Sequence, residues 1–97
     1  MNLLEWIQDW YCKNCADEWA DSYGIKIETL DNPGWLVKID IRETPLENNS
    51  FDSLHIDGGD DDWIFCDVKD CVFQGAGDPT KLTRIFEVFR DWAERPE

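Results

Sequence analysis

The stretch SYGIKIETLDNPGWLVKID, residues 22–40, constrains the fold of this chain more than any other. Two runs that alternate apolar and polar residues flank the turn sequence DNPG. Pro33 fixes φ at the first central position of a β-turn and Gly34 allows a positive φ at the second, so a type II turn is expected. The segment therefore predicts an antiparallel hairpin that is buried on one face only. The side chains expected on that face are Ile25, Ile27, Val37 and Ile39.

Helices are predicted towards both ends of the chain. Asn2 and Glu5 have the spacing of an N-terminal capping pair, and apolar residues at helical spacing continue over about residues 3–19. Near the other end, Asp78 is expected to cap a second helix, with Pro79 at its first helical position. The apolar stripe of that helix consists of Leu82, Ile85, Phe86, Phe89 and Trp92.

Three more strands are predicted between the hairpin and the second helix, over 51–57, 63–68 and 71–74. The sequence Gly75-Ala76-Gly77 is expected to end the sheet. Ninety-seven residues make a single domain, so residues 1–97 are assigned to one unit. The order of elements predicts an α+β fold, an antiparallel meander of about five strands bracketed by an N-terminal and a C-terminal helix. Both helices are expected on one face of the sheet.

The chain carries 22 acidic and 9 basic residues, a formal net charge of −13 at pH 7. Such a charge repels nucleic acid and anionic membranes, and it speeds encounter with a basic partner. We therefore expect neither nucleic acid nor a membrane as a partner, although acidic surfaces also serve solubility alone. No export leader and no apolar run of the ~18 residues that span a bilayer is visible, so the cytoplasm is the expected compartment.

The four cysteines are the first residues to consider as a metal or redox site. Cys12 and Cys15 would share a helix face, and Cys66 and Cys71 flank a turn, so the four could bind one zinc ion. The two spacings, C-x2-C and C-x4-C, depart from the paired short knuckles of zinc sites. A redox pair needs a helix N-terminus to lower its thiol pKa, and this pair lies late in a helix. Reduced thiols packed as small apolar residues are favoured, and no cofactor is expected.

Catalysis has no recognisable pattern in this sequence. The only histidine, His55, lies on the polar face of an expected strand, and G-x-S-x-G, H-E-x-x-H and P-loop patterns are absent from the sequence. We therefore expect a protein that is not an enzyme.

The densest charge lies between residues 52 and 70, where seven acidic residues accompany one basic residue. The run Asp57-Gly58-Gly59-Asp60-Asp61-Asp62 does not begin a calcium-binding loop of the EF-hand type. Such a loop needs a Glu at its twelfth position, and the twelfth residue counted from Asp57 is Val68. An exposed acidic turn beside an aromatic residue suits a protein interface. The contact residues expected on this basis are Asp57, Asp60, Asp61, Asp62, Trp63, Asp67 and Asp70, with Trp35 as a further candidate.

Four segments, WIQDWYCKNCADEWADSYGIKIETLDNPGW, DDDWIFC, GAG and IFEVFRDW, follow one another between Leu4 and Trp92. In wording and order they resemble the immunity 53 family of bacterial polymorphic toxin systems. The resemblance implies a non-enzymatic cytoplasmic inhibitor that binds a cognate toxin domain and blocks its active site or substrate path. The implied toxin is often a nuclease, and a basic nuclease cleft fits the acidic charge. No catalytic residue is carried over by the resemblance.

Two other classes of function stay open at this point. An acidic mimic of nucleic acid would inhibit DNA-binding proteins generally and would bind many basic proteins. A small zinc-binding protein built on the four cysteines would hold metal when purified. The sequence names neither the toxin nor the oligomeric state.

Overall fold

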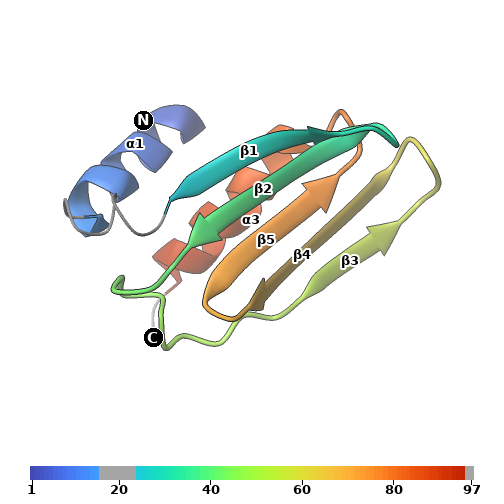
Figure 1. Cartoon of the computed structure of the whole chain (residues 1–97). Coiled ribbons are helices and arrows are strands. Elements are labelled where there is room, and N and C mark those ends of the chain that lie inside the picture. The colour runs from blue at the N-terminus through green and yellow to red at the C-terminus, as the bar shows by residue number, and fades with distance from the viewer. Residues whose placement is uncertain (16–23, 96–97) are drawn as a thin grey trace.

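The computed structural model of the chain describes residues 1–15 and 24–95. Helix α1 (Leu3–Asn14) precedes the strands and helix α3 (Leu82–Glu94) follows them (Figure 1). The strands are β1 (Ile25–Leu30), β2 (Gly34–Asp40), β3 (Leu54–Asp57), β4 (Trp63–Lys69) and β5 (Val72–Gly77). All five join one antiparallel sheet. The predicted α+β class, with helices flanking the strands, is confirmed.

The strand order across the sheet is β1-β2-β5-β4-β3, which differs from a continuous meander. Strands β3, β4 and β5 are joined by successive hairpins, while β2 lies beside β5, as in a Greek key. The segment 41–53 therefore carries the chain from the middle of the sheet to its far edge. Burial agrees with this order, because Val37 and Ile39 of the interior strand β2 are fully buried, whereas the short edge strand β3 is mostly exposed.

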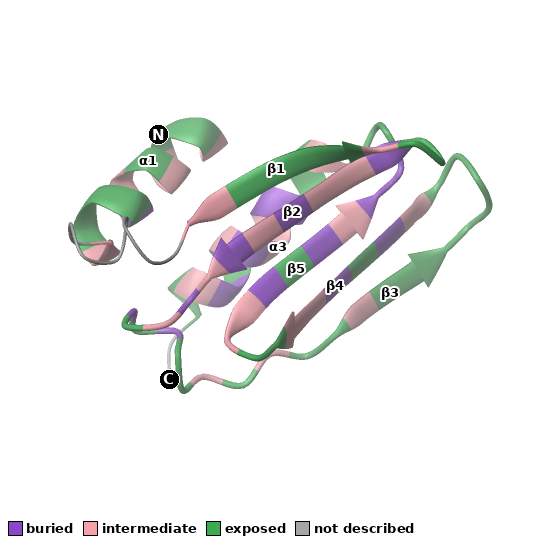
Figure 2. Cartoon of the chain, in the orientation of Figure 1, coloured by how far each residue is buried: buried purple, intermediate pink, exposed green. Residues whose placement is uncertain are grey.

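Helix α3 covers one face of the sheet, and the core lies between them (Figure 2). Phe73 of β5 and Phe89 of α3 are fully buried, with ring centroids 5.1 Å apart. Helix α1 packs on α3 through Trp10, whose ring lies 5.1 Å from that of Phe89. Both described helices thus lie on the same side of the sheet. We call the opposite side, which neither of them covers, the open face; Leu36, Phe65, Ala76 and His55 lie across it.

The predicted type II turn in the first hairpin is wrong. The Asn32-Pro33 peptide bond is cis, and a cis proline at the third position defines a type VI turn. Gly34 starts β2 without a positive φ. A glycine is needed there for another reason, since a Cβ would contact the carbonyl oxygen of Gly77 on β5. Of the four predicted buried residues, Ile27 is 49% exposed because β1 is an edge strand.

The prediction that Gly75-Ala76-Gly77 ends the sheet is also wrong, because these residues belong to β5. A Cβ at Gly75 would contact Cγ2 of Ile85, and one at Gly77 would lie 2.6 Å from Cβ of Lys81. The glycines therefore let helix α3 and the turn before it approach the sheet closely. In the sequence these glycines indicate a break in the strand, whereas in the structure they allow close packing against the helix.

The ends of several elements differ from the prediction. The capping pair of α1 is confirmed, with the Glu5 N–H 2.9 Å from Asn2 Oδ1, but the helix ends at Asn14, and residues 16–19 of the predicted helix lie outside the described residues. Helix α3 starts at Leu82, with Lys81 as its N-cap, so the predicted cap at Asp78 is wrong.

Strand β3 starts only at Leu54, because Phe51 turns into the core against Phe73 and Trp92. Strand β5 starts after Cys71, which has a φ of 61° in the turn. Among the described residues, no helix is long and apolar enough to cross a membrane.

Candidate functional site

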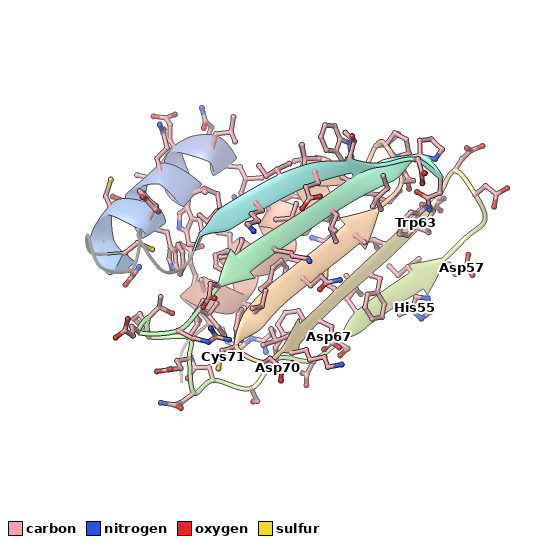
Figure 3. All side chains as sticks on the ribbon, viewed as in Figure 1. His55, Asp57, Trp63, Asp67, Asp70 and Cys71 are labelled. Atoms are coloured by element: carbon pink, nitrogen blue, oxygen red, sulfur yellow. The ribbon has the colours of Figure 1, made fainter. Side chains whose placement is uncertain are left out.

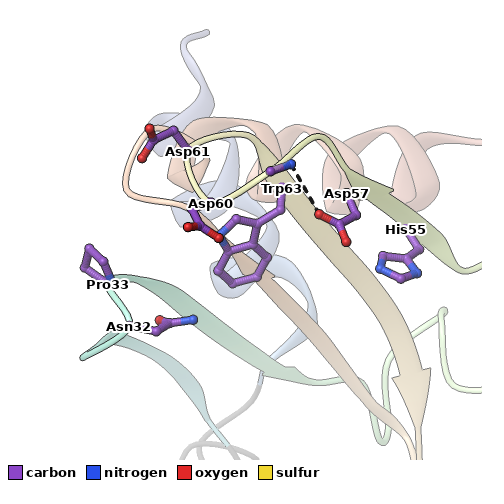
Figure 4. A pocket seen from close by; sticks show the side chains of 8 residues that line it. Asn32, Pro33, His55, Asp57, Asp60, Asp61 and Trp63 are labelled. Carbon is purple, nitrogen blue, oxygen red and sulfur yellow. Dashed lines mark hydrogen bonds between the residues drawn. The ribbon is translucent and has the colours of Figure 1, made fainter.

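Two hairpin turns meet at one end of the sheet and enclose an open hollow of about 430 Å³ (Figure 4). Strand register brings them together, because Trp35, Gly77 and Ile64 lie side by side across β2, β5 and β4. The segments just before Trp35 and Ile64 therefore emerge at the same end. We call this site the turn hollow; it is lined by Asn32, Pro33, His55, Asp57, Gly59, Asp60, Asp61 and Trp63.

The β3–β4 turn, residues 58–62, is held by its own backbone. The Gly58 N–H donates to the carbonyl oxygen of Asp62 at 2.7 Å, and the Asp62 N–H donates to that of Gly59 at 3.2 Å. Gly59 has a φ of 111°, and its N–H donates to Asp57 Oδ1 at 3.3 Å. This geometry leaves Asp60 and Asp61 exposed at the tip of the turn, on the rim of the hollow.

The turn hollow is an acidic site with an aromatic floor. Asp57, Asp60 and Asp61 supply three exposed carboxylates, and none of them forms an ion pair within the described part of the chain. The half-buried indole of Trp63 lies between the two turns. A cationic group placed there would meet carboxylates at the rim and an aromatic face below. The arrangement is suited to binding positive charge.

Asp62 points to a different partner. Its Oδ1 lies 2.8 Å from Nζ of Lys81, and the same Nζ lies 2.8 Å from Oδ2 of Asp78. The Asp78 side chain is fully buried, and its Oδ2 also accepts the Trp63 N–H at 2.9 Å. Thr80 donates to Asp78 through both its N–H and its hydroxyl group. This network ties the start of β4, and with it Trp63, to the start of α3.

Electrostatics keeps the network ionised. Hydrogen bonds from Lys81 and then Thr80 hold the pKa of Asp78 well below its ordinary value of 3.8, against the opposing effect of burial. Hydrogen bonds to Asp62 and Asp78 raise the pKa of Lys81 above its ordinary 10.5. The ammonium group therefore stays between two carboxylates at neutral pH.

The remaining predicted contact residues lie outside the hollow. Asp67 is on the open face, where it accepts the Ser53 hydroxyl at 2.7 Å, and Asp70 is in the turn at the opposite end of the sheet (Figure 3). Trp35 is on the helix-covered side, and its Nε1–H donates to the carbonyl oxygen of Pro79 at 3.0 Å. The structure thus gathers Asp57, Asp60, Asp61 and Trp63 and places Asp62, Asp67, Asp70 and Trp35 elsewhere.

Sequence reasoning did not include Asn32, Pro33 and His55 in the site. The turn at Pro33 has no sequence signal of a binding site, and only the pairing of β2 with β5 brings it next to the acidic turn. His55 had a weak signal, since it alternates with Asp57 along β3 and must share its face. Its ring packs edge-on against Phe65 at 5.5 Å.

The four cysteines do not form a shared site. Cys12 is exposed on α1, Cys66 is a fully buried residue of β4, and all four thiols are free. In residues 1–15 and 24–95, no three His, Cys, Asp or Glu side chains are grouped to hold a metal ion. Burial raises the thiol pKa of Cys15 and of Cys66 to about 11 in each case, so both are protonated at neutral pH. The zinc alternative gains no support from this geometry.

Comparison with known proteins identifies the family of the chain. The family model described as Immunity protein 53 matches residues 4–94, nearly the whole length. The comparisons with curated proteins and with solved structures gave no match. Membership of this family indicates an immunity function exercised by binding a cognate toxin, and such proteins are generally not enzymes. With its sequence matched from residue 4 to residue 94, the chain belongs to the Immunity protein 53 family.

Proposed function

We propose that this protein neutralises a cognate toxin domain by binding it through the turn hollow. The observation that carries the proposal is the convergence of Asp57, Asp60 and Asp61 around Trp63 in a member of an immunity family. The protein acts by occupying a surface on the toxin, in the cytoplasm, and it needs no chemical step or cofactor of its own.

The charge of the chain supports a basic toxin surface as the target. A net charge of −13 on 97 residues produces a field that accelerates association with a positively charged partner. Enzymes that cleave nucleic acid present positive charge to the phosphate backbone. We therefore propose a nuclease domain as the toxin, with the acidic rim of the hollow placed against its substrate cleft.

The aromatic floor supports an anchored contact rather than a diffuse charge attraction. Trp63 lies among the carboxylates, and Phe65, two residues further along β4, is 39% exposed on the open face. Interfaces commonly concentrate binding energy in aromatic residues surrounded by polar groups that exclude water. In this proposal the toxin inserts a basic side chain over Trp63 and covers part of the open face, including Asp67.

The other expected contact residues take different roles in the proposal. Asp62 and Trp35 act from behind the hollow, since each is bonded to the segment that leads into α3. Asp70 lies at the far end of the sheet and is outside the contact.

The test is protection of growth by co-expression with the toxin domain encoded beside this gene. The wild type should restore growth, and the D60K/D61K double variant should protect less at equal protein level because the rim becomes basic. The matched control is E47K/D52K, which makes the same charge change at two exposed positions of the segment 41–53. Full protection by D60K/D61K, or equal loss in the control, would contradict binding through the hollow.

A further inference from the structure

Strand β1 is an edge strand of the sheet, and no other described strand pairs with its outer side. It pairs with β2, and no hydrogen bond from another described segment reaches its outer edge. The bond from the Asp40 N–H to the Gly24 carbonyl oxygen, at 3.2 Å, sets the alternation of the ladder. Even-numbered residues of β1 therefore bond to β2, and the backbone groups of Ile25, Ile27 and Thr29 point outward. This edge is able to accept another strand.

We propose that two copies of this chain pair through their β1 strands, antiparallel, with the two Ile27 residues facing each other on the two-fold axis. The proposal concerns a surface separate from the turn hollow and does not depend on the toxin. In this register Lys26 of each copy faces Glu28 of the other. Such a pair lies between hydrogen-bonded pairs, where opposing Cα atoms are only about 4.5 Å apart.

The charges select this register over its neighbours. Only shifts by an even number of residues keep the outward backbone groups in contact with one another, and the nearest of these are shifts of two residues. One such shift places Lys26 against Lys26, and the other places Glu28 against Glu28. Both bring like charges together, which is unfavourable for residues directly opposite in a sheet.

Within the described residues, neither Lys26 nor Glu28 has an opposite charge directly across the β1–β2 ladder. Lys26 faces Lys38 across the β1–β2 ladder, and Glu28 faces Leu36. Neither forms an ion pair with another described residue. A second copy would place an opposite charge beside each of them.

An apolar hollow on the helix-covered side fits the same occupant. It has a volume of about 340 Å³ and is lined by apolar side chains of α1, β1 and α3, among them Leu3, Leu4, Ile27, Leu82 and Phe86. Leu4 is 69% exposed and Ile27 is 49% exposed. An added strand would lie about 4.8 Å beyond β1, so its helix-side residues would stand over this hollow. The proposed pairing places the Ile27 side chain of the second copy over this apolar hollow.

The pairing leaves the toxin-binding region free. The end of β1 at Leu30 leads into the turn of Pro33, which lines the turn hollow. Because the two strands run antiparallel, the two turn hollows lie at opposite ends of the joined sheet. Each copy can therefore bind one toxin domain.

The test is sedimentation equilibrium of the full chain, up to millimolar concentration, with variants at the edge. The wild type should form a dimer that strengthens with salt, because screening reduces the repulsion between two bodies of charge −13. K26E and E28K should each weaken it roughly ten-fold or more, since each variant replaces two attractive pairs by two repulsive ones. The K26E/E28K variant, with unchanged net charge, should recover the wild-type dissociation constant.

The sharpest test is to mix the K26E and E28K variants. Equimolar K26E and E28K should form a heterodimer that neither forms alone, because every Glu then faces a Lys. The matched control K69E makes the same charge change at an exposed position of β4, three strands away from β1, and should weaken the dimer far less than K26E does. Circular dichroism verifies that each variant is folded. A monomeric wild type throughout the range, a dimer insensitive to K26E, or a folded mixture that stays monomeric would each overturn the proposal.

Discussion

Asp78 and the three aspartates of the turn hollow lie near Trp63 and differ in almost every physical respect. Asp78 is fully buried and accepts hydrogen bonds from Trp63, Thr80 and Lys81. The carboxylates of the turn hollow are exposed and lack an ion pair within the described residues. One residue type therefore holds the fold together on one side and leaves a charged surface on the other. The number of donors around each carboxylate decides which role it takes.

The largest effect on thermal stability should come from removing the buried carboxylate of Asp78. In the Asp78→Ala variant, the Trp63 N–H and the Lys81 ammonium group lose their shared acceptor inside the protein. Donors left without partners cost far more than a surface contact, so we expect the melting temperature to fall by roughly 10 °C or more. Calorimetry measures the fall. The matched control is Asp61→Ala on the rim, and an equal fall there would erase the distinction between the two groups.

A smaller loss is expected for Lys81→Met. The variant removes the cation between Asp62 and Asp78, while the Trp63 and Thr80 donors to Asp78 remain. We expect a fall in melting temperature of roughly 5 °C. Asp62 should also lose its fixed position, which amide exchange in the β3–β4 turn can detect. Unchanged exchange there would show that the ion pair does not hold the turn.

Acid should reduce the contribution of Asp78 in a defined direction. Its pKa in the folded protein lies below the ordinary value of 3.8, so the folded form favours the carboxylate. The stability gained is complete above that ordinary value and is lost as the pH falls towards the lower folded value. The difference in melting temperature between the wild type and Asp78→Asn should therefore shrink between about pH 5 and about pH 2. A constant difference over that range would contradict the assignment.

The smallest effect on stability should come from the rim. The variant D60N/D61N removes two solvated charges that hold no ion pair within the described residues. We expect the free energy of unfolding to change by no more than about 0.5 kcal/mol. Urea denaturation measures it. A large loss would mean that the rim carboxylates belong to the fold and are not a free surface.

The same comparison shows what could be predicted from the sequence. The alternation along β1 and β2 and the stripe of α3 gave the class of fold, because periodicity reports directly which side chains face the core. The acidic turn beside Trp63 was likewise visible, since its residues are neighbours in sequence.

Features that depend on contacts between residues far apart in the sequence could not be predicted. The pairing of β2 with β5 brings Pro33 beside the acidic turn, and no local pattern encodes that pairing. Gly75 and Gly77 indicated a break in the sheet, whereas their small size serves the close approach of Ile85 and Lys81. Asp78 had the sequence context of a helix cap, but its partners include Trp63, fifteen positions earlier.

The central claim is that the turn hollow binds the toxin, and the dissociation constant for the purified toxin domain tests it most directly. The wild-type affinity should weaken as salt is raised, because attraction between opposite charges is screened. Relative to it, D60K/D61K should bind roughly ten-fold or more weakly with a reduced salt dependence, while E47K/D52K keeps most of the affinity. Equal affinity and equal salt dependence in the wild type and D60K/D61K would contradict the claim.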